Sequence, residues 1–332
     1  MSFFAILFAL LIEQVRPLGA HNPIHTGLRV WARWVSRNFD AGKPQHGWVA
    51  WALAVVAPAL AALGIHWALT LFVGWPAGMV WSVIVLYVTL GFRQFSHHFT
   101  EIRDALESGD EGRARELLAL WQRVDASELP RSEIVRHVIE YSVLAAHRHV
   151  FGVLAWFSIL AAFGFGPAGA VLYRMAEFVG RYWRWRNRTH AQPASEALQS
   201  AAARAWTAVD WLPARMTAIA FAVVGSFEEA IDCWRNYAQR FPNDNDGVIL
   251  AATSGAINVR LGGQALQPVF APNASGTFQA SGLGMEPPIG TDSTPGREAE
   301  VAHLRTVVGL VWRSVVLWMV LLALLTLARL LG

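Results

Sequence analysis

The chain of 332 residues is poor in cysteine, in lysine and in charged side chains generally. Its one cysteine, Cys233, excludes a disulfide within the chain and any zinc site built from cysteines. We expect this thiol to be a small buried residue of a helix, because a reactive thiol needs an exposed and electropositive setting. Lys43 is a rare lysine, so arginine supplies nearly all of the positive charge.

Charged residues make up 15% of the chain, against roughly a quarter in an average soluble domain. Hydrophobic residues make up 54%, and the mean hydropathy is +0.34. This composition predicts a membrane protein. The net charge is +3, and the arginines flank the apolar runs, which fits the excess of basic residues at the cytosolic ends of membrane spans. Nucleic-acid binding is not expected, because no recognition motif accompanies the scattered basic residues.

Several apolar runs have the length of membrane spans. Trp48–Trp75 and Val307–Leu331 are each long enough to cross a bilayer, and Pro76–Phe92 predicts a shorter span. Tyr141–Gly180 predicts two spans or a re-entrant pair, because a Gly-Phe-Gly-Pro segment interrupts it. Met1–Ile12 is shorter than the ~20 residues of a full span and lacks the features of a cleaved signal peptide, so we expect a short or re-entrant helix.

Two further segments are amphipathic. Within Arg16–His46, Trp31 and Trp34 share a helical spacing with other apolar residues, which predicts a helix on the cytoplasmic leaflet. Residues 93–140 are rich in charge, with apolar residues at three- and four-residue intervals and a turn at Ser108–Asp110. That pattern predicts a soluble helical hairpin.

Together these features predict an all-α fold, a polytopic integral membrane protein with a cytosolic helical hairpin arm. We expect residues 16–46, 93–140 and 181–210 to face the cytosol. The predicted parts are an N-terminal membrane segment with an amphipathic basic helix and two spans (1–92), the arm (93–140), membrane helices with polar motifs (141–263), a Gly/Pro/Ser-rich loop (264–306) and a C-terminal transmembrane helix (307–332).

Two polar motifs stand out in the second half. Asp210–Ala218 reads Asp-Trp-Leu-Pro-Ala-Arg-Met-Thr-Ala and is expected to open an apolar helix that runs to Gly225. Gly255–Gly263 reads Gly-Ala-Ile-Asn-Val-Arg-Leu-Gly-Gly. Between them, a helix over Phe227–Arg240 is expected to stop at a turn of residues 243–247.

These motifs resemble the CobD/CbiB family, integral membrane proteins of cobalamin biosynthesis, whose members show "PARLTA" and then "GALGVRLGG". Residues 166–174 and 240–247 add to the similarity, and residues 105–136 resemble the central arm of the family. The resemblance therefore covers most of the chain.

The resemblance implies amide formation, in which a corrin carboxyl of cobyric acid is joined to an aminopropanol unit to give cobinamide or its phosphate. It implies ATP and Mg²⁺ as cofactors, a corrinoid substrate, and a multi-pass location in the bacterial inner membrane, where membrane partner proteins are conceivable. No protein residue is assigned as a metal ligand. The residues given catalytic roles are Asp125 and Asp210, and those given substrate-binding roles are Arg136, Arg215, Asn258 and Arg260.

The chemistry of these side chains suits that reaction. Arg215 and Arg260 offer planar forks for carboxylate or phosphate, and Asp125 and Asp210 can hold a metal or accept the proton of the amine. The alternative left open is that Asp210 caps a helix N-terminus and Arg215 is an interfacial anchor.

The chain also departs from the family pattern. A Glu-Asn…Asp-Gly…Pro motif of the family corresponds here to a run that has lost the acids: Leu144 and Ala145 stand in this run, and Arg148 stands where an acid is expected. An arginine there would repel a divalent metal, which predicts altered or lost catalysis. The alternative function is a non-catalytic AmpE-like inner-membrane sensor or accessory protein, since such proteins share the Asp-Trp-x-Pro-x-Arg segment.

Overall fold

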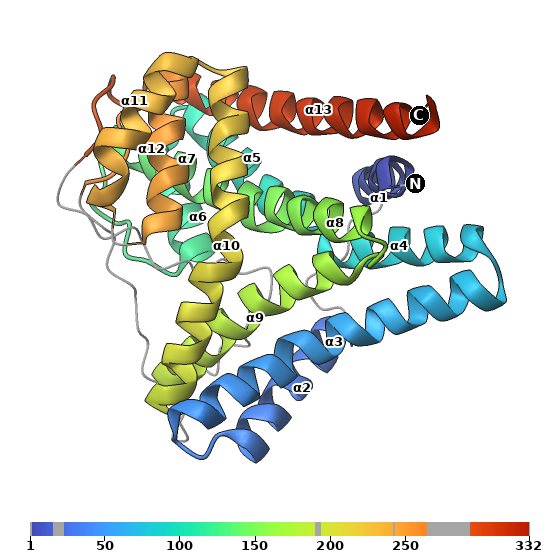
Figure 1. Ribbon diagram of the computed structural model, residues 1–332. Coiled ribbons are helices and arrows are strands. Elements are labelled where there is room, and N and C mark those ends of the chain that lie inside the picture. Colours follow the sequence, from blue (N-terminus) through green and yellow to red (C-terminus); the bar gives the residue numbers. More distant parts are fainter. Residues whose placement is uncertain (1, 16–22, 190–193, 242, 264–292, 332) are drawn as a thin grey trace. The chain divides into compact units, whose positions relative to one another are not determined.

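The computed structural model describes residues 2–15, 23–189, 194–241, 243–263 and 293–331 (Figure 1). Every regular element in these ranges is a helix, which confirms the predicted all-α fold. Four helical stretches are long and apolar enough to cross a membrane, as expected for a polytopic membrane protein. They are Pro44–Phe72, Arg131–Ala162, Glu196–Val224 and Val301–Ala328.

The chain folds as two compact units. The described part of the first unit comes from residues 1–91 and 152–212, and that of the second from residues 92–151, 213–263 and 293–331. Two long helical stretches pass from one unit to the other, one between Phe151 and Gly152 and one between Leu212 and Pro213.

The first unit is built from helices that pack pairwise. Helix α3 packs on α4 and on α9, α8 packs on α9, and α1 packs on α4. Gly169 allows the close approach of α8 and α9, because a Cβ atom there would collide with the Trp156 carbonyl. Its helices are α1 (Ser2–Val15), α2 (Pro23–Phe39), α3 (Pro44–Phe72), α4 (Trp75–Thr89), α8 (Gly152–Ala162), α9 (Ala168–Thr189) and the first part of α10 (Glu196–Val224).

The second unit contains the predicted hairpin and the family motifs. Its elements are α5 (Phe92–Glu107), α6 (Glu111–Gln122), α7 (Arg131–Ala146), the π-helix η1 (His147–Phe151), the second part of α10, α11 (Phe227–Tyr237), the 3₁₀ turn η2 (Ala238–Arg240), α12 (Asp244–Ile257) and α13 (Val301–Leu331).

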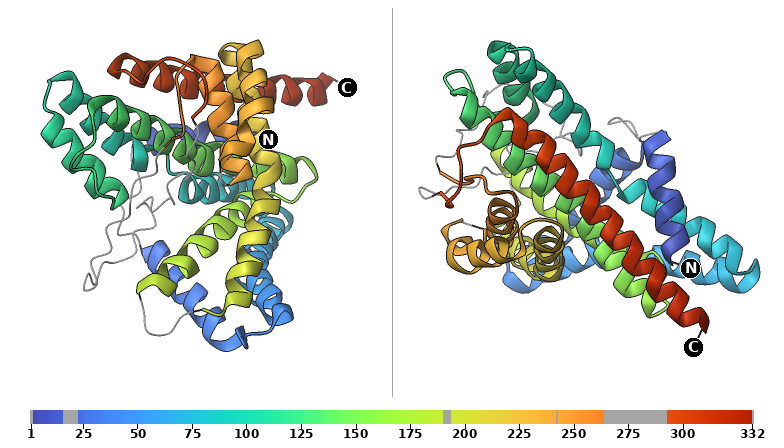
Figure 2. Two further views of the ribbon diagram at one scale, coloured as in Figure 1. Left: turned by 90° about the vertical axis from the view of Figure 1, so that its left-hand side faces the viewer. Right: turned by 90° about the horizontal axis from the view of Figure 1, so that it is seen from above.

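The hairpin of α5 and α6 turns where the sequence predicts. Gly109 has a positive φ of 82°, and the Asp110 carboxylate caps α6 by accepting from the Arg113 N–H. Helices α11 and α12 lie side by side (Figure 2). They approach closely because Gly255 leaves room for the Glu229 carbonyl, with which a Cβ atom would collide.

Two predicted spans are recovered as long helices with changed boundaries: α3, which continues through Pro58, and α13. The shorter span predicted at Pro76–Phe92 is the 15-residue apolar helix α4, and the long helix Glu196–Val224 was not predicted as a span. The run expected to form two spans or a re-entrant pair instead gives the end of one long helix, Arg131–Ala162, followed by α9. The long helix begins inside the segment assigned to the arm.

Two local predictions are wrong. No helix begins at Asp210, because α10 starts at Glu196 and runs through both Asp210 and Pro213. Residues 243–247 are not a stopping turn either: Asn243 is the N-cap of α12, which begins at Asp244.

The predicted loop of residues 264–306 is described only from residue 293 onward, so most of it lies outside the described residues. Residues 293–297 form backbone hydrogen bonds with the Gly255–Gly263 motif. The Arg260 N–H donates to the Arg297 carbonyl at 2.8 Å, and the Thr294 N–H donates to the Leu261 carbonyl at 2.8 Å.

Candidate functional site

Proline in the Asp210–Ala218 motif leaves a gap in the hydrogen bonding of α10. Pro213 has no N–H, so the carbonyl of Val209, four residues earlier, loses its partner within the helix. The Trp156 indole N–H donates to that carbonyl at 2.9 Å. A donor from another helix therefore allows α10 to continue past the proline.

Asp210 is fully buried in the first unit. The Tyr173 hydroxyl donates to its Oδ1 at 2.8 Å. Gly152 makes room for Tyr173, because a Cβ atom there would collide with the tyrosine ring. Asp210 is thus a hydrogen-bonded side chain within a helix, and the alternative that it caps a helix N-terminus is wrong. Its catalytic role stays a prediction.

In the second unit, Arg148 forms an ion pair with Asp246. Its Nη2 lies 2.7 and 2.9 Å from the two carboxylate oxygens, and the Asn243 amide donates to Oδ2 at 2.8 Å. The exposed fractions of the two paired side chains are only 10% and 11%. The positive charge that the sequence places at Arg148 is therefore balanced by a carboxylate from α12.

The residues around this pair come from the π-helix, from the Asp210–Ala218 motif and from the start of α12. Arg215 Nη1 donates to the Asn245 amide oxygen at 3.1 Å, one residue before Asp246. His147 Nδ1 lies 2.9 Å from the Thr217 hydroxyl oxygen. We call these six residues the arginine cluster: His147, Arg148, Arg215, Thr217, Asn245 and Asp246.

Thr217 links His147 to the backbone of α10. Its hydroxyl donates to the Pro213 carbonyl at 2.9 Å. The same oxygen can accept from His147 Nδ1 in the tautomer that carries its proton on that nitrogen. His147, Arg148 and His149 are all buried, and they lie in a π-helix, a conformation that is frequent at functional sites.

A second group of charged residues, which we call the α7 cluster, consists of Arg136, Glu133 and Glu140. Arg136 Nη1 donates to Glu140 Oε1 at 2.8 Å, and its other nitrogens donate to Glu133. The Gly262 N–H donates to the same Glu140 oxygen at 2.7 Å. Gly262 and Gly263 have positive φ values of 85° and 107°, which explains why the motif ends in two glycines. Glu140 thus holds this glycine turn beside Arg136.

The other predicted residues lie in more exposed positions. Asn258 is the exposed C-cap of α12 with a φ of 52°, a left-handed conformation that asparagine tolerates well. Arg260 is also exposed, and its backbone pairs with Arg297. Asp125 is exposed and accepts from the Ser127 hydroxyl and N–H, which lowers the pKa of its carboxyl.

Sequence reasoning did not single out Glu140 or Asp246. The spacing of four residues between Arg136 and Glu140 was a readable signal, because such a pair shares one face of a helix. Asp246 gave no such signal, since its partner Arg148 lies 98 residues away in the chain.

Acidic side chains of the described residues do not gather into a metal site. Nowhere in the described part of the chain do three or more His, Cys, Asp or Glu side chains lie close enough to hold a metal ion. The carboxylates of the two clusters are held instead by arginines, by an amide and by a backbone N–H. These residues do not fit a Mg²⁺ ion held by protein carboxylates.

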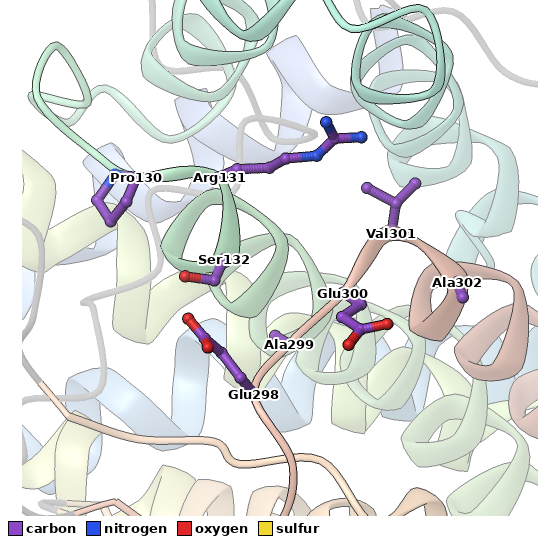
Figure 3. Close-up of a pocket in the computed structure, with 8 residues that line it drawn as sticks. All are labelled: Pro130, Arg131, Ser132, Glu298, Ala299, Glu300, Val301 and Ala302. Carbon is purple, nitrogen blue, oxygen red and sulfur yellow. The ribbon is translucent and has the colours of Figure 1, made fainter.

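A cavity of about 590 Å³ lies between the start of α7 and the segment that leads into α13 (Figure 3). Its lining includes Arg131, Glu298 and Glu300. Arg131 donates to the Leu106 carbonyl at 2.8 Å. None of the predicted site residues lines this cavity, so we take the arginine cluster and the α7 cluster as the candidate functional site.

Comparison with known proteins agrees with the motifs. The sequence model of the family described as "CobD/Cbib protein" matches residues 3–271. The cobalamin biosynthesis protein CobD of Stutzerimonas stutzeri is 30% identical over 328 residues, 96% of either chain. That of Chromobacterium violaceum is 32% identical over 236 residues, 71% of this chain and 67% of the relative. That of Leptospira interrogans is 27% identical over 194 residues, 57% of this chain and 58% of the relative.

No solved structure gives a significant match. Nothing in the comparisons favours the AmpE-like alternative. The family match spans most of the sequence and one relative aligns along nearly its whole length, so the chain belongs to the CobD/CbiB family of cobalamin biosynthesis membrane proteins, as its two motifs predicted.

Proposed function

We propose that the protein forms an amide bond between a side-chain carboxyl of a corrinoid and an aminopropanol unit, giving cobinamide or its phosphate. One observation supports this function above others: two segments that resemble the family meet at the arginine cluster, where Arg215 of the first motif contacts Asn245 at the start of α12. The Asp246 carboxylate balances the positive charge of Arg148, so this arginine alone does not argue for an inactive protein.

The reaction needs a carboxylate with a leaving group and an amine that loses a proton. ATP, the cofactor that the family implies, would supply the phosphoryl group that makes the carboxyl oxygen a leaving group. The amine nitrogen then attacks the carboxyl carbon, the carbon–oxygen bond to phosphate breaks, and the amine proton passes to a base. No step is assigned to a metal held by protein carboxylates.

Side chains of the second unit suit these roles. Arg215 carries a guanidinium group of the kind that binds carboxylate or phosphate oxygens in pairs. Arg136 keeps its predicted substrate-binding role, with its nitrogens held by Glu133 and Glu140. His147 is the candidate base, because imidazole is the commonest proton acceptor in enzymes and the Thr217 hydroxyl holds this ring within the arginine cluster. Asp125 and Asp210 keep their predicted catalytic roles, and Asn258 and Arg260 their predicted contacts with substrate.

The protein is proposed to lie in the bacterial cytoplasmic membrane with several spans. The charged α5–α6 hairpin and the basic segments 16–46 and 181–210 are placed on the cytosolic side, by the bias of arginine toward that side. A reporter fused at Arg113, an exposed residue of α6, tests this arrangement. A periplasmic signal from that fusion would overturn it.

Complementation of a strain that cannot make cobinamide tests the function. The intact chain should restore growth, and Arg215→Lys should weaken the rescue, because lysine lacks the planar fork. Arg235→Lys is the matched control, since Arg235 is exposed on α11 outside both clusters. Absence of rescue by a protein that is present and folded in the membrane would refute the proposed function. Equal rescue by the Arg215 and Arg235 variants would refute the role of Arg215.

A further inference from the structure

Helix α2 carries three different faces. One face is buried, with Ala32 and Val35 fully covered. A second face exposes apolar side chains, with Val30 58% and Trp34 47% exposed. The third consists of arginines at intervals of four residues, and residues four apart share one side of a helix. These arginines are Arg29, Arg33 and Arg37.

Contacts within the first unit hold α2 in one orientation. The Trp183 indole of α9 donates to the Ala32 carbonyl at 3.2 Å, and Arg186 of α9 donates to the Ser36 hydroxyl at 2.8 Å. The Trp31 indole donates to the Ala54 carbonyl of α3 at 3.2 Å. The packing of the buried face therefore leaves the apolar face and the side chains of Arg33 and Arg37 exposed, while Arg29 is partly buried and Arg33 Nε also donates to the Tyr182 hydroxyl of α9 at 3.4 Å.

Aromatic rings gather where α2 meets the start of α3. Trp31 stacks on Trp34 at 5.3 Å between ring centroids, and Trp34 meets Phe39 edge-on at 5.7 Å. Trp48, in the first turns of α3, is 44% exposed. Mixtures of tryptophan and arginine at the end of a membrane span are typical of the level of lipid headgroups.

The charge of α2 is of one sign. Its sequence from Pro23 to Phe39 contains three arginines and no acidic residue. The nearest acid along the chain, Asp40, is engaged by the N–H and hydroxyl of Ser195. A surface with an apolar face beside a row of positive charges suits an anionic bilayer surface, and a spanning helix begins five residues after α2 ends.

We propose that α2 is a binding surface for anionic phospholipids, with Val30 and Trp34 set among the upper acyl chains and Arg29, Arg33 and Arg37 at the headgroup phosphates. The surface fixes the depth of the first unit in the membrane. The occupant is the anionic lipid of the bilayer itself, because the exposed apolar face adjoins the arginines and a free phosphate would not cover it.

Native mass spectrometry of the full chain in detergent, titrated with phosphatidylglycerol or phosphatidylcholine, tests this proposal. Phosphatidylglycerol should bind more tightly than phosphatidylcholine. The double change of Arg33→Gln and Arg37→Gln should weaken the affinity for phosphatidylglycerol by roughly fivefold per arginine. The same two positions changed to lysine should keep most of the preference, since the charge remains. The matched control changes Arg113 and Arg235 to glutamine, which removes equal charge from exposed sites in the second unit.

A depth measurement gives a second readout. In a Cys233→Ala background, a polarity-sensitive probe at Val30→Cys should report an apolar setting in vesicles that contain phosphatidylglycerol, while one at Glu116→Cys on α6 should report water. Equal affinity for the two lipids, equal losses in the α2 and control variants, or an aqueous signal at residue 30 would each overturn the proposal. A residue 30 probe that is shielded in native membranes but aqueous in lipid vesicles would assign the face to a protein partner and also overturn it.

Discussion

The ion pair of Arg148 and Asp246 allows a sharp test of the site. Arg148→Met keeps most of the volume of the side chain but leaves the Asp246 carboxylate buried without a cation. Asn243 still donates to Oδ2, but one neutral amide cannot replace a full charge. Because both side chains are about nine-tenths buried, the loss should approach the ~3–5 kcal/mol typical of breaking a buried pair. That is a large share of the ~5–15 kcal/mol that stabilises an ordinary domain.

The double variant separates the pair from its parts. Asp246→Asn alone should be destabilising as well, since it leaves Arg148 without its carboxylate. Arg148→Met with Asp246→Asn removes both charges and should be much closer to the intact protein than the sum of the two single changes.

Thermal unfolding in detergent, followed by circular dichroism, measures the ranking. Arg113→Met, at an exposed pair with Glu116, is the control and should change little. The reasoning is refuted if Arg148→Met unfolds within experimental error of the control, or if the double variant is as unstable as the two losses added together.

Three further changes test other parts of the structure. Gly152→Ala should destabilise the protein by about 1–3 kcal/mol, because the new methyl group collides with Tyr173, and a melting temperature equal to that of the intact protein would contradict this packing. Glu140→Gln should cost about 1–3 kcal/mol, since a charged acceptor for Arg136 and the Gly262 N–H is lost, and limited proteolysis should then cut more readily near residue 262. Burial lowers the pKa of His98, helped by the positive charge of His97, so the folded protein binds that proton later than the unfolded chain. Stability should fall as the pH drops below about 6.5, and His98→Gln should flatten that part of the pH profile.

The spans and the hairpin could be predicted because their signals are local. The length of an apolar run sets whether it can cross a bilayer, and the spacing of Phe99, Ile102 and Leu106 shows one buried face in α5. The prediction that a helix starts at Asp210 was wrong because the deciding contact comes from another helix. A proline usually marks a helix boundary, but here the Trp156 indole supplies the missing donor to Val209, across 53 residues of the chain.

The site could be predicted only in part for the same reason. Arg136 and Arg215 were identified because they stand in motifs of the family, and both make polar contacts in the second unit. Arg148 was visible only as a departure from the family pattern, since its partner Asp246 meets it through the packing of α12. The roles of Asp125 and Arg260 remain predictions. Both side chains are exposed, so their surroundings neither support nor contradict a role in the site.

The hydrogen bond from the Trp156 indole to α10 makes positions 156 and 213 depend on each other. With proline at position 213, loss of the Trp156 N–H strands a carbonyl inside an apolar helix. With a residue that has its own N–H at position 213, the same loss matters little. Replacement of the tryptophan should therefore be costly only while the proline is present, so the two positions should not vary independently.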